Sequence, residues 1–158
     1  MELNGTEEYI EHIVTAYSST LLRLAYTILH SAADAEDAVQ EVFIRLMTKK
    51  PEFSGSEHEK AWLIRVTVNI SRNMLKSAAR HSAPLDGDLA SPEPESLGEL
   101  LDAVMKLPER YGTVLHLYYY EGYSIKEISE ILRLPAATVG TRLARGRTLL
   151  KISLEGEV

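Results

Sequence analysis

Cysteine is absent from this chain of 158 residues, which excludes disulfide bonds and thiolate metal sites. There is also no uninterrupted apolar run of about 20 residues, the length that a membrane-spanning helix requires. The opening stretch, MELNGTEEYIEHI, is acidic where a secretory signal peptide is basic, so no signal peptide is expected. Together these absences predict a folded protein of the reducing cytoplasm.

The sequence also lacks the residue patterns of common catalytic and cofactor sites. It contains no glycine-rich phosphate loop, no dinucleotide-binding fingerprint, no H-E-x-x-H motif and no nucleophile elbow. The five histidines are scattered along the chain, without a pair at i, i+4. The acidic residues between Asp34 and Glu41 suit the start of a helix and a solvated face better than a magnesium site. We therefore expect no enzymatic activity, no metal ion and no cofactor.

Positive charge is confined to two parts of an otherwise acidic chain. The formal net charge is −6, which argues against a protein that binds DNA unaided and nonspecifically, since such affinity comes from lysine and arginine. Residues 133–151, however, contain five basic residues and no acidic one, and residues 57–80 contain five basic residues and two acidic ones. Basic islands of this kind are typical of nucleic-acid contacts.

The stretch from Ser124 to Lys151 has the pattern of a helix-turn-helix. Ser124 and Glu127 have the spacing of a capping box, in which each side chain satisfies a backbone N–H group at the start of a helix. Apolar residues then recur at helical spacing. Pro135 fits the first turn of a new helix, which leaves a short turn at residues 133–134. We therefore predict two helices joined by a tight turn.

The second helix of this pair divides into a packing face and a free face at about 100° per residue. The packing stripe comprises Val139, Leu143, Gly146 and Leu150. The free face comprises Thr138, Thr141, Arg145 and Thr148, with Arg142 on its flank. Small polar residues and arginine on an exposed helix fit the major groove of DNA. An amphipathic surface helix with a solvated basic face is the alternative.

A further helix is expected directly before the helix-turn-helix. Pro108 suits its first turn, and Gly122 suits the residue after its end. The run from Tyr118 to Tyr120 should pack against the core with its hydroxyl groups at the rim, rather than form a stacking platform for bases.

Three more helices are expected in the first half of the chain. Residues 7–30 carry apolar residues at steps of three and four without proline or glycine, which predicts a long helix with one buried face. A second helix should begin near Asp34, and a capping box of Ser56 and Glu59 should start a third. The third helix combines amides and cations after an aromatic residue, a pattern that fits unstacked bases and phosphates: Trp62, Arg65, Asn69, Arg72, Asn73, Lys76 and Arg80. For Trp62 alone, a place in the core is the commoner outcome.

Composition changes sharply after Arg80. Residues 81–95, HSAPLDGDLASPEPE, hold three prolines, one glycine and four acidic residues, and they predict a flexible linker. The fold class is therefore predicted to be all-α, with two small helical domains at residues 1–80 and 96–158. The second domain contains the helix-turn-helix, and the linker would allow the two domains to sit well apart.

The order of these parts resembles the small two-domain sigma factors of bacterial RNA polymerase, the extracytoplasmic-function (ECF) group of the sigma-70 family. DAEDAVQEVFIRL, residues 34–46, is similar to the family segment that docks on the clamp helices of the polymerase β′ subunit. AWLIRVTVNISRN, residues 61–73, is similar to the segment that opens and reads the minus-10 promoter element. LPERYGTVLHLYYYEGYSIKEISEIL and PAATVGTRLARGRTLL are similar to the domain that binds the minus-35 element as duplex.

The resemblance implies a function, partners and site residues. It implies a non-enzymatic subunit that binds core polymerase and directs promoter-specific transcription initiation, with promoter DNA as a partner and an anti-sigma factor as a frequent further one. The residues that it places on the polymerase are Asp37, Gln40, Glu41, Ile44 and Arg45. Those that it places on the separated minus-10 strand are Asn69, Arg72, Asn73 and Lys76. Those that it places on the minus-35 duplex are Thr138, Thr141, Arg142, Arg145 and Arg147.

Two positions depart from the family pattern. Gly140 and Ala144 stand where many members carry a basic or larger side chain on the recognition helix, and glycine inside a helix costs about 1 kcal/mol relative to alanine.

The main alternative function is a stand-alone helix-turn-helix regulator in which residues 1–80 sense a signal or dimerise. A protein-interaction module with a degenerate helix-turn-helix is the second alternative, and Gly140 is its best support.

Overall fold

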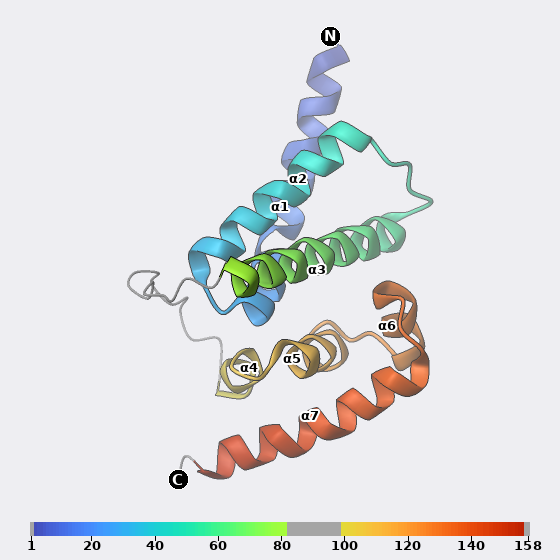
Figure 1. Ribbon diagram of the computed structural model, residues 1–158. Coiled ribbons are helices and arrows are strands. Elements are labelled where there is room, and N and C mark those ends of the chain that lie inside the picture. The colour runs from blue at the N-terminus through green and yellow to red at the C-terminus, as the bar shows by residue number, and fades with distance from the viewer. Residues whose placement is uncertain (1, 82–98, 157–158) are drawn as a thin grey trace.

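Helices make up the architecture of the protein (Figure 1). The computed structural model describes residues 2–81 and 99–156, with side chains from residue 7 to 78 and from 100 to 156. Within these residues there is no strand, which confirms the predicted all-α class. Apart from His81, the predicted linker lies outside the described residues. In chain order the helices are α1 (Glu2–Leu29), α2 (Ala32–Lys49), α3 (Ser56–His81), α4 (Glu99–Met105), α5 (Glu109–Leu115), η2 (His116–Tyr120), α6 (Ile125–Leu132) and α7 (Ala136–Gly156).

Helices α1, α2 and α3 pack together as the N-terminal half of the molecule. Helix α2 begins two residues before the predicted start at Asp34, because Ser31 caps it: the Ser31 hydroxyl accepts a hydrogen bond from the Asp34 backbone N–H at 3.2 Å. The apolar positions of α2 face α1 and α3, and five of its residues are buried: Ala35, Ala38, Val39, Val42 and Leu46.

The predicted capping box at the start of α3 is wrong. Ser56 is the first helical residue rather than the residue before the helix, and the Glu59 backbone N–H donates to the Gly55 carbonyl at 3.0 Å. The Glu59 carboxylate instead accepts a hydrogen bond from the Tyr9 hydroxyl at 2.7 Å and a longer one from Tyr17 at 3.4 Å. Glu59 therefore ties α3 to α1 instead of closing its own helix end.

The predicted helix-turn-helix is confirmed in helices α6 and α7. The Glu127 backbone N–H donates to the Ser124 hydroxyl at 3.1 Å, and the Ser124 backbone N–H donates to the Glu127 carboxylate at 2.9 Å. Arg133, with φ of 59°, ends α6 in the left-handed region, and α7 begins just after Pro135. The buried residues of α7 are those of the predicted packing stripe: Val139, Leu143, Gly146 and Leu150.

The helix expected between Pro108 and Gly122 is regular only in its first half. It starts after Pro108 and continues as α5, but residues 116–120 form the π-helical turn η2. There the Glu121 backbone N–H donates to the His116 carbonyl at 3.0 Å, five residues back. Gly122 then ends the segment with φ of +81°, a conformation that glycine adopts without strain.

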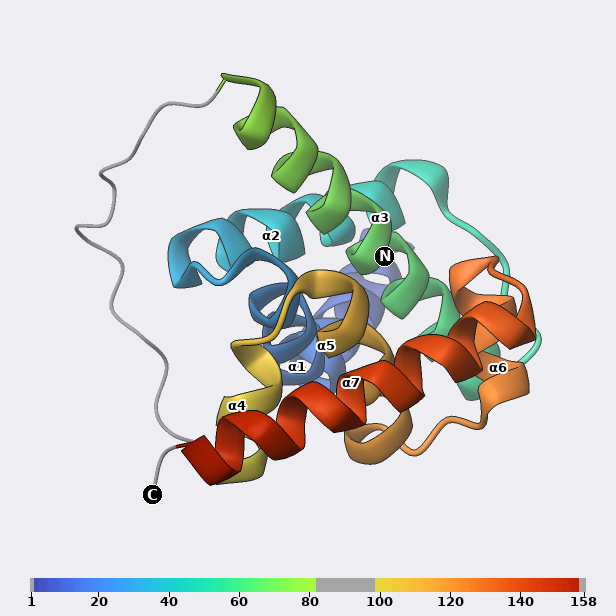
Figure 2. The same cartoon turned by 60° about the horizontal axis from the view of Figure 1, so that its bottom comes forward.

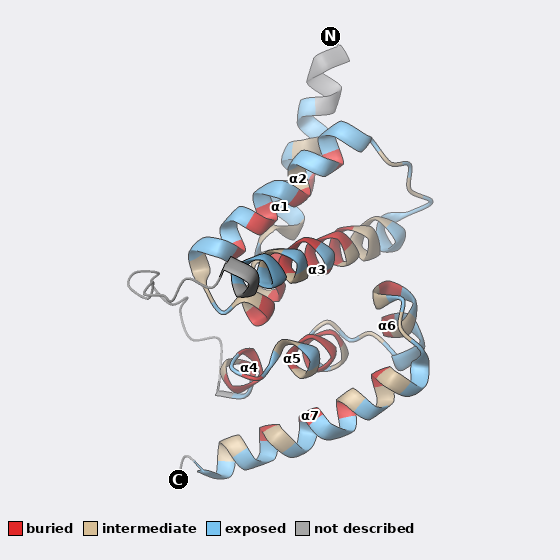
Figure 3. Cartoon of the chain, in the orientation of Figure 1, coloured by how far each residue is buried: buried red, intermediate tan, exposed pale blue. Residues whose placement is uncertain are grey.

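The two halves of the chain pack against each other, although the sequence would have allowed them to sit apart. Helix α1 contacts α4 and α5, and α3 contacts α6, as Figures 1 and 2 both display. The buried faces of these helices point toward one another (Figure 3), and their apolar side chains form a single cluster that includes residues of both halves. The packing is tight at Gly112, where an added Cβ would lie 3.2 Å from Thr27 Cγ2 of α1 and 3.0 Å from the Val104 carbonyl oxygen of α4.

Two glycine-to-alanine substitutions should have opposite effects on stability. Gly140→Ala should raise the free energy of unfolding by about 1 kcal/mol, because alanine is the better helix former and the new Cβ would meet no atom within 4 Å. Gly112→Ala should lower it by about 1–3 kcal/mol, because the added methyl group is forced against α1 and a backbone carbonyl. Urea denaturation of both variants checks this pair. Equal stabilisation by both would contradict the close packing at Gly112.

Candidate functional site

The five residues predicted to face the polymerase lie together on the outer surface of α2. Asp37, Gln40, Glu41, Ile44 and Arg45 are all exposed. Arg45 Nε lies 3.8 Å from the Glu41 carboxylate one turn earlier, an exposed ion pair of small energetic value. Ile44 is 46% exposed although it is aliphatic, and Met47, one turn further along α2, is 43% exposed. Apolar and charged side chains are thus exposed together on this helix, a mixture that suits a protein-binding surface as well as a solvated one.

The residues predicted to meet the minus-10 strand lie along α3, but they differ in solvent exposure and in their contacts with other side chains. Asn69, Asn73 and Lys76 are exposed. Arg72 is partly buried, and its Nε lies 3.6 Å from the carboxylate of Glu109 at the start of α5. In this arrangement Arg72 is therefore engaged by the C-terminal half of the chain.

Trp62 belongs to the edge of the core, as expected for that residue alone. It is partly buried and packs against the apolar cluster. Its ring meets that of Phe53 edge-on, with 5.8 Å between the ring centroids.

The residues predicted to contact the minus-35 duplex do not all lie on one face of α7. Thr138, Thr141, Arg142 and Arg145 follow the i, i+3, i+4, i+7 spacing of a single stripe and line one surface hollow. Arg147 lies two residues beyond Arg145, about 200° around the helix, and donates a hydrogen bond to the Tyr119 hydroxyl at 3.2 Å. The structure therefore separates Arg147 from the other four residues.

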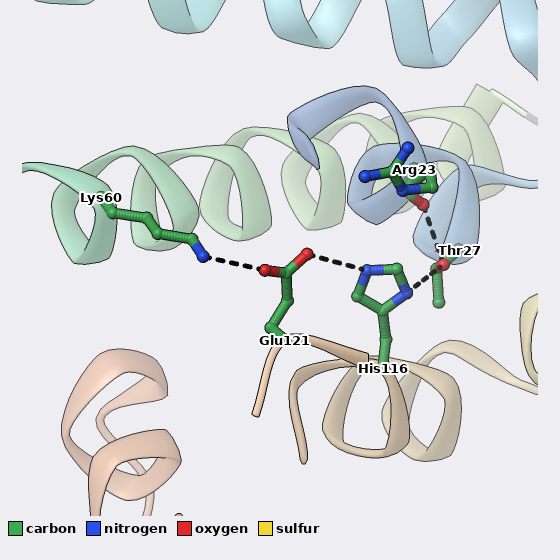
Figure 4. A network of polar contacts seen from close by, with 5 residues as sticks. All are labelled: Arg23, Thr27, Lys60, His116 and Glu121. Carbon is green, nitrogen blue, oxygen red and sulfur yellow. Dashed lines mark hydrogen bonds and ion pairs between the residues drawn. The ribbon is translucent and has the colours of Figure 1, made fainter. Parts of the chain in front are cut away.

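A line of polar side chains crosses the contact between the two halves (Figure 4). Lys60 Nζ of α3 lies 3.0 Å from Glu121 Oε1, and Glu121 Oε2 lies 3.8 Å from His116 Nε2. On the other side of the imidazole, His116 Nδ1 lies 3.3 Å from the Thr27 hydroxyl of α1, which donates to the Arg23 carbonyl at 2.9 Å. Side chains of α3, η2 and α1 are thus joined through one buried histidine.

This line of residues was not found by sequence reasoning, which treated His116 as one of several scattered histidines. Its members are far apart in the sequence and follow no motif, so only the packing of the two halves brings them together. A second set of contacts reinforces them: the Arg23 guanidinium lies 4.9 Å from the centroid of the Tyr120 ring, and Lys60 Nζ lies 5.7 Å from that of Tyr123.

The electrostatics of the contact centre on Glu121, whose side chain is only 7% exposed. Burial by itself raises the pKa of this carboxyl group, but His116 and Lys60 beside it stabilise the ionised form, and the net pKa is lowered. Nearby, burial and the negative charge of Glu121 raise the pKa of Tyr123 to about 12. The interface therefore favours an ionised Glu121 and a neutral Tyr123 at pH 7.

The described residues contain neither a metal-ion site nor a membrane-spanning helix. No group of three or more histidine or acidic side chains there could hold a metal ion. No helix within residues 2–81 or 99–156 is long and apolar enough to cross a membrane.

The contribution of Glu121 to stability should depend on pH. Because its pKa is lower in the folded chain, its stabilising effect should be complete above about pH 5 and should be lost as the pH falls below the usual glutamate value of about 4.3. We expect Glu121→Gln to lower the free energy of unfolding at pH 7, and we expect this loss to shrink as the pH falls below about 4.3 toward the lowered pKa of the folded chain. Urea denaturation across this range measures the difference, with Glu130→Gln as the exposed-carboxylate control. A difference that stays constant with pH would contradict the role of Glu121.

Comparison with known proteins assigns a family to both halves of the chain. Residues 13–81 match sigma-70 region 2, and residues 97–150 match sigma-70 region 4. The chain is 30% identical to the ECF RNA polymerase sigma factor SigW of Bacillus subtilis, over 95% of this chain and 91% of that protein. It is 27% identical to the RNA polymerase sigma-H factor of Pseudomonas aeruginosa, over 96% of this chain and 89% of that protein.

The fold is also found among solved structures. The sigma factor RpoE from Bartonella quintana, in its co-crystal structure with the anti-sigma factor NepR, superposes with a TM-score of 0.72 at 19% identity. The match covers 92% of this chain and 96% of that one. With both regions matched in order and full-length relatives at this identity, the chain belongs to the ECF group of sigma-70 family sigma factors, the subunits that direct RNA polymerase in transcription initiation.

Proposed function

We propose that this sigma factor binds core polymerase through α2, captures the separated minus-10 strand on α3 and reads the minus-35 duplex with α7. The observation that carries the proposal is that each of these helices turns a set of predicted contact residues to solvent. We assign the first two roles to a domain of residues 1–80 and the last to a domain of residues 96–158. The role is that of a specificity subunit without catalysis of its own, in the cytoplasm where the polymerase works.

The α2 surface is suited to a protein partner. Its charged residues form a polar rim, and Ile44 supplies the apolar centre that an interface core requires. We propose that Ile44 enters an apolar site on the polymerase clamp, while Asp37 and Gln40 pair with polar groups around it.

The α3 surface is suited to a single strand. Asn69 and Asn73 lie one turn apart and offer amide groups to the exposed edges of bases, and Lys76 adds a charge for the backbone. Unpaired bases become accessible only in the open promoter, so these contacts favour strand separation. Arg72 must leave Glu109 before it can join them, since one guanidinium faces the Glu109 carboxylate at 3.6 Å.

The α7 surface is suited to duplex DNA. Thr141 and Arg145 are exposed on the stripe that also holds Thr138 and Arg142. An arginine on a helix in the major groove can pair with guanine, and the shorter threonine side chains allow close approach to the bases. Gly140 carries no side chain and leaves open space beside them.

We also propose an anti-sigma factor as a regulator of this chain. The support is the fold shared with the Bartonella quintana protein, which was solved bound to such a factor. A protein that holds the two halves in contact would keep Arg72 paired with Glu109 and away from DNA.

Run-off transcription tests the function directly. Core polymerase from a bacterium should begin RNA synthesis at new positions in a promoter library when this chain is added. An unchanged pattern of start sites, together with no binding of the chain to core polymerase, would refute the proposal.

Replacing the exposed isoleucine of α2 should weaken polymerase binding. Ile44→Ala should reduce the affinity for core polymerase about tenfold, which corresponds to the loss of about 1.4 kcal/mol of apolar contact. Ile152→Ala is the control, because Ile152 is an exposed isoleucine on α7 (60% exposed, against 46% for Ile44) that lies outside the proposed clamp contact. Fluorescence anisotropy with labelled chain measures both affinities. An equal loss for the two variants would remove the assignment of α2 as the polymerase face.

Two substitutions should change the affinity for single-stranded minus-10 DNA in opposite directions. Asn73→Ala should weaken binding of the holoenzyme to single-stranded minus-10 DNA by about tenfold, because a base contact worth about 1–3 kcal/mol is lost. Glu109→Gln should strengthen binding of the same DNA to the free chain, because Arg72 is no longer held by a carboxylate. Titration with a labelled single strand measures both. Tighter binding by Asn73→Ala, or weaker binding by Glu109→Gln, would contradict these roles.

A further inference from the structure

A basic hollow lies between the start of α5 and the first half of α7, and its α5 side is not part of any site described above. The hollow has a volume of about 370 Å³ and opens to solvent. From α7 it is lined by Thr138, Thr141, Arg142 and Arg145, and from α5 by Arg110 and Tyr111. The recognition helix therefore shares this surface with a helix that precedes the helix-turn-helix.

Close packing at Gly146 holds the α5 wall of the hollow in place. An added Cβ at Gly146 would lie 2.9 Å from Leu115 Cδ1 and 3.4 Å from Tyr111 Cβ, so the absence of a side chain at Gly146 allows α5 to pack closely on α7. Leu115 is fully buried, which fixes the position of α5 against α7. Tyr111 is thereby positioned beside the turn of α7 that carries Arg142 and Arg145.

The charge of the hollow is positive and is not neutralised within the described part of the chain. Among these residues, no carboxylate forms an ion pair with Arg110, Arg142 or Arg145. The Arg110 guanidinium lies 4.7 Å from the centroid of the Tyr111 ring. A hydrogen bond from Arg110, and to a lesser extent the charge of Arg145, lowers the pKa of Tyr111 despite its partial desolvation.

We propose that this hollow binds a phosphate of the DNA backbone, with Arg110 and Tyr111 of α5 supplying contacts beside Arg142 and Arg145 of α7. Three guanidinium groups provide charge and planar donors that match phosphate oxygens. The hydroxyl groups of Tyr111, Thr138 and Thr141 provide further donors. Arg110 and Tyr111 thus position the recognition helix on the duplex without reading its sequence.

The surroundings favour a DNA backbone over a free phosphate as the ligand. The hollow is open on one side, so a phosphodiester can enter without burial of the neighbouring sugars. It also shares Thr141 and Arg145 with the face proposed to enter the major groove, and the backbone borders that groove on both sides. This inference rests on the proposed reading of the minus-35 duplex by α7.

The salt dependence of promoter binding tests the inference. Holoenzyme carrying Arg110→Ala should bind a promoter found by run-off transcription on the order of tenfold more weakly, and the slope of log K against log salt should fall by about 0.9. Tyr111→Phe should weaken binding less, and Arg110→Lys should restore most of the slope. Lys106→Ala, which removes an exposed cation outside the hollow, is the control and should leave the slope unchanged.

A second measurement separates positioning from reading. Arg110→Ala should weaken binding equally to promoters with an intact and with a mutated minus-35 element, whereas Arg145→Ala should reduce the difference between them. If Arg145→Ala has this effect but Arg110→Ala behaves like Lys106→Ala, the inference is wrong and the proposed function stands. If neither substitution changes promoter binding, both are wrong.

A third measurement addresses free phosphate. At equal ionic strength, inorganic phosphate in place of chloride should change the melting temperatures of the unsubstituted chain and of Arg110→Ala by the same amount, since phosphate also stabilises folded proteins without binding a site. If phosphate stabilises the unsubstituted chain more than Arg110→Ala, and the salt slope for DNA is the same for both, the hollow binds a free anion and the assignment to DNA is overturned.

Discussion

The packing of the two halves of the chain depends on the carboxylate of Glu121. This side chain links helices that lie far apart in the sequence. It lies at the end of η2 with its side chain turned to Lys60 of α3 on one side and to His116 on the other. His116 in turn meets Thr27 of α1. A buried charge is tolerated only when it is paired, so the position of Glu121 requires both partners to be close. The apolar cluster around them supplies the area, and the polar line supplies the relative orientation.

This contact affects the three functional surfaces unequally. The outer face of α2 and the basic stripe of α7 both remain open to solvent, whereas α3 is partly covered because α6 packs against it and Glu109 holds Arg72. The proposed contacts with polymerase and with the minus-35 duplex are therefore compatible with the packed arrangement. The proposed contact of Arg72 with the minus-10 strand requires that Arg72 first leave the carboxylate of Glu109.

Local interactions were predictable from the sequence and long-range ones were not. The capping box of Ser124 and Glu127 and the packing stripe of α7 depend on residues within a few turns of one another, so spacing alone was sufficient. Helix α2 begins near Asp34, as predicted, but its exact start is set by the cap at Ser31, and Glu59 contacts Tyr9 of α1 instead of closing its own helix end. The family resemblance, not the spacing, places Arg147 with Arg145, but Arg147 donates a hydrogen bond to Tyr119 instead. The contacts of Lys60 with Glu121 and of Arg72 with Glu109 depend on how the halves pack, which no local pattern encodes.

The π-helical turn makes the length of one short segment as important as its composition. A regular α-helix advances about 100° per residue, and the wider turn at His116–Tyr120 delays that rotation by one residue before Gly122 ends the segment. Loss of a single tyrosine there would bring the wrong side of the helix toward α1 and α3. The three tyrosines could be exchanged for other large side chains one at a time, whereas an insertion or deletion among them would separate His116 from Glu121. Substitutions in this segment are therefore expected to be tolerated more readily during evolution than insertions or deletions.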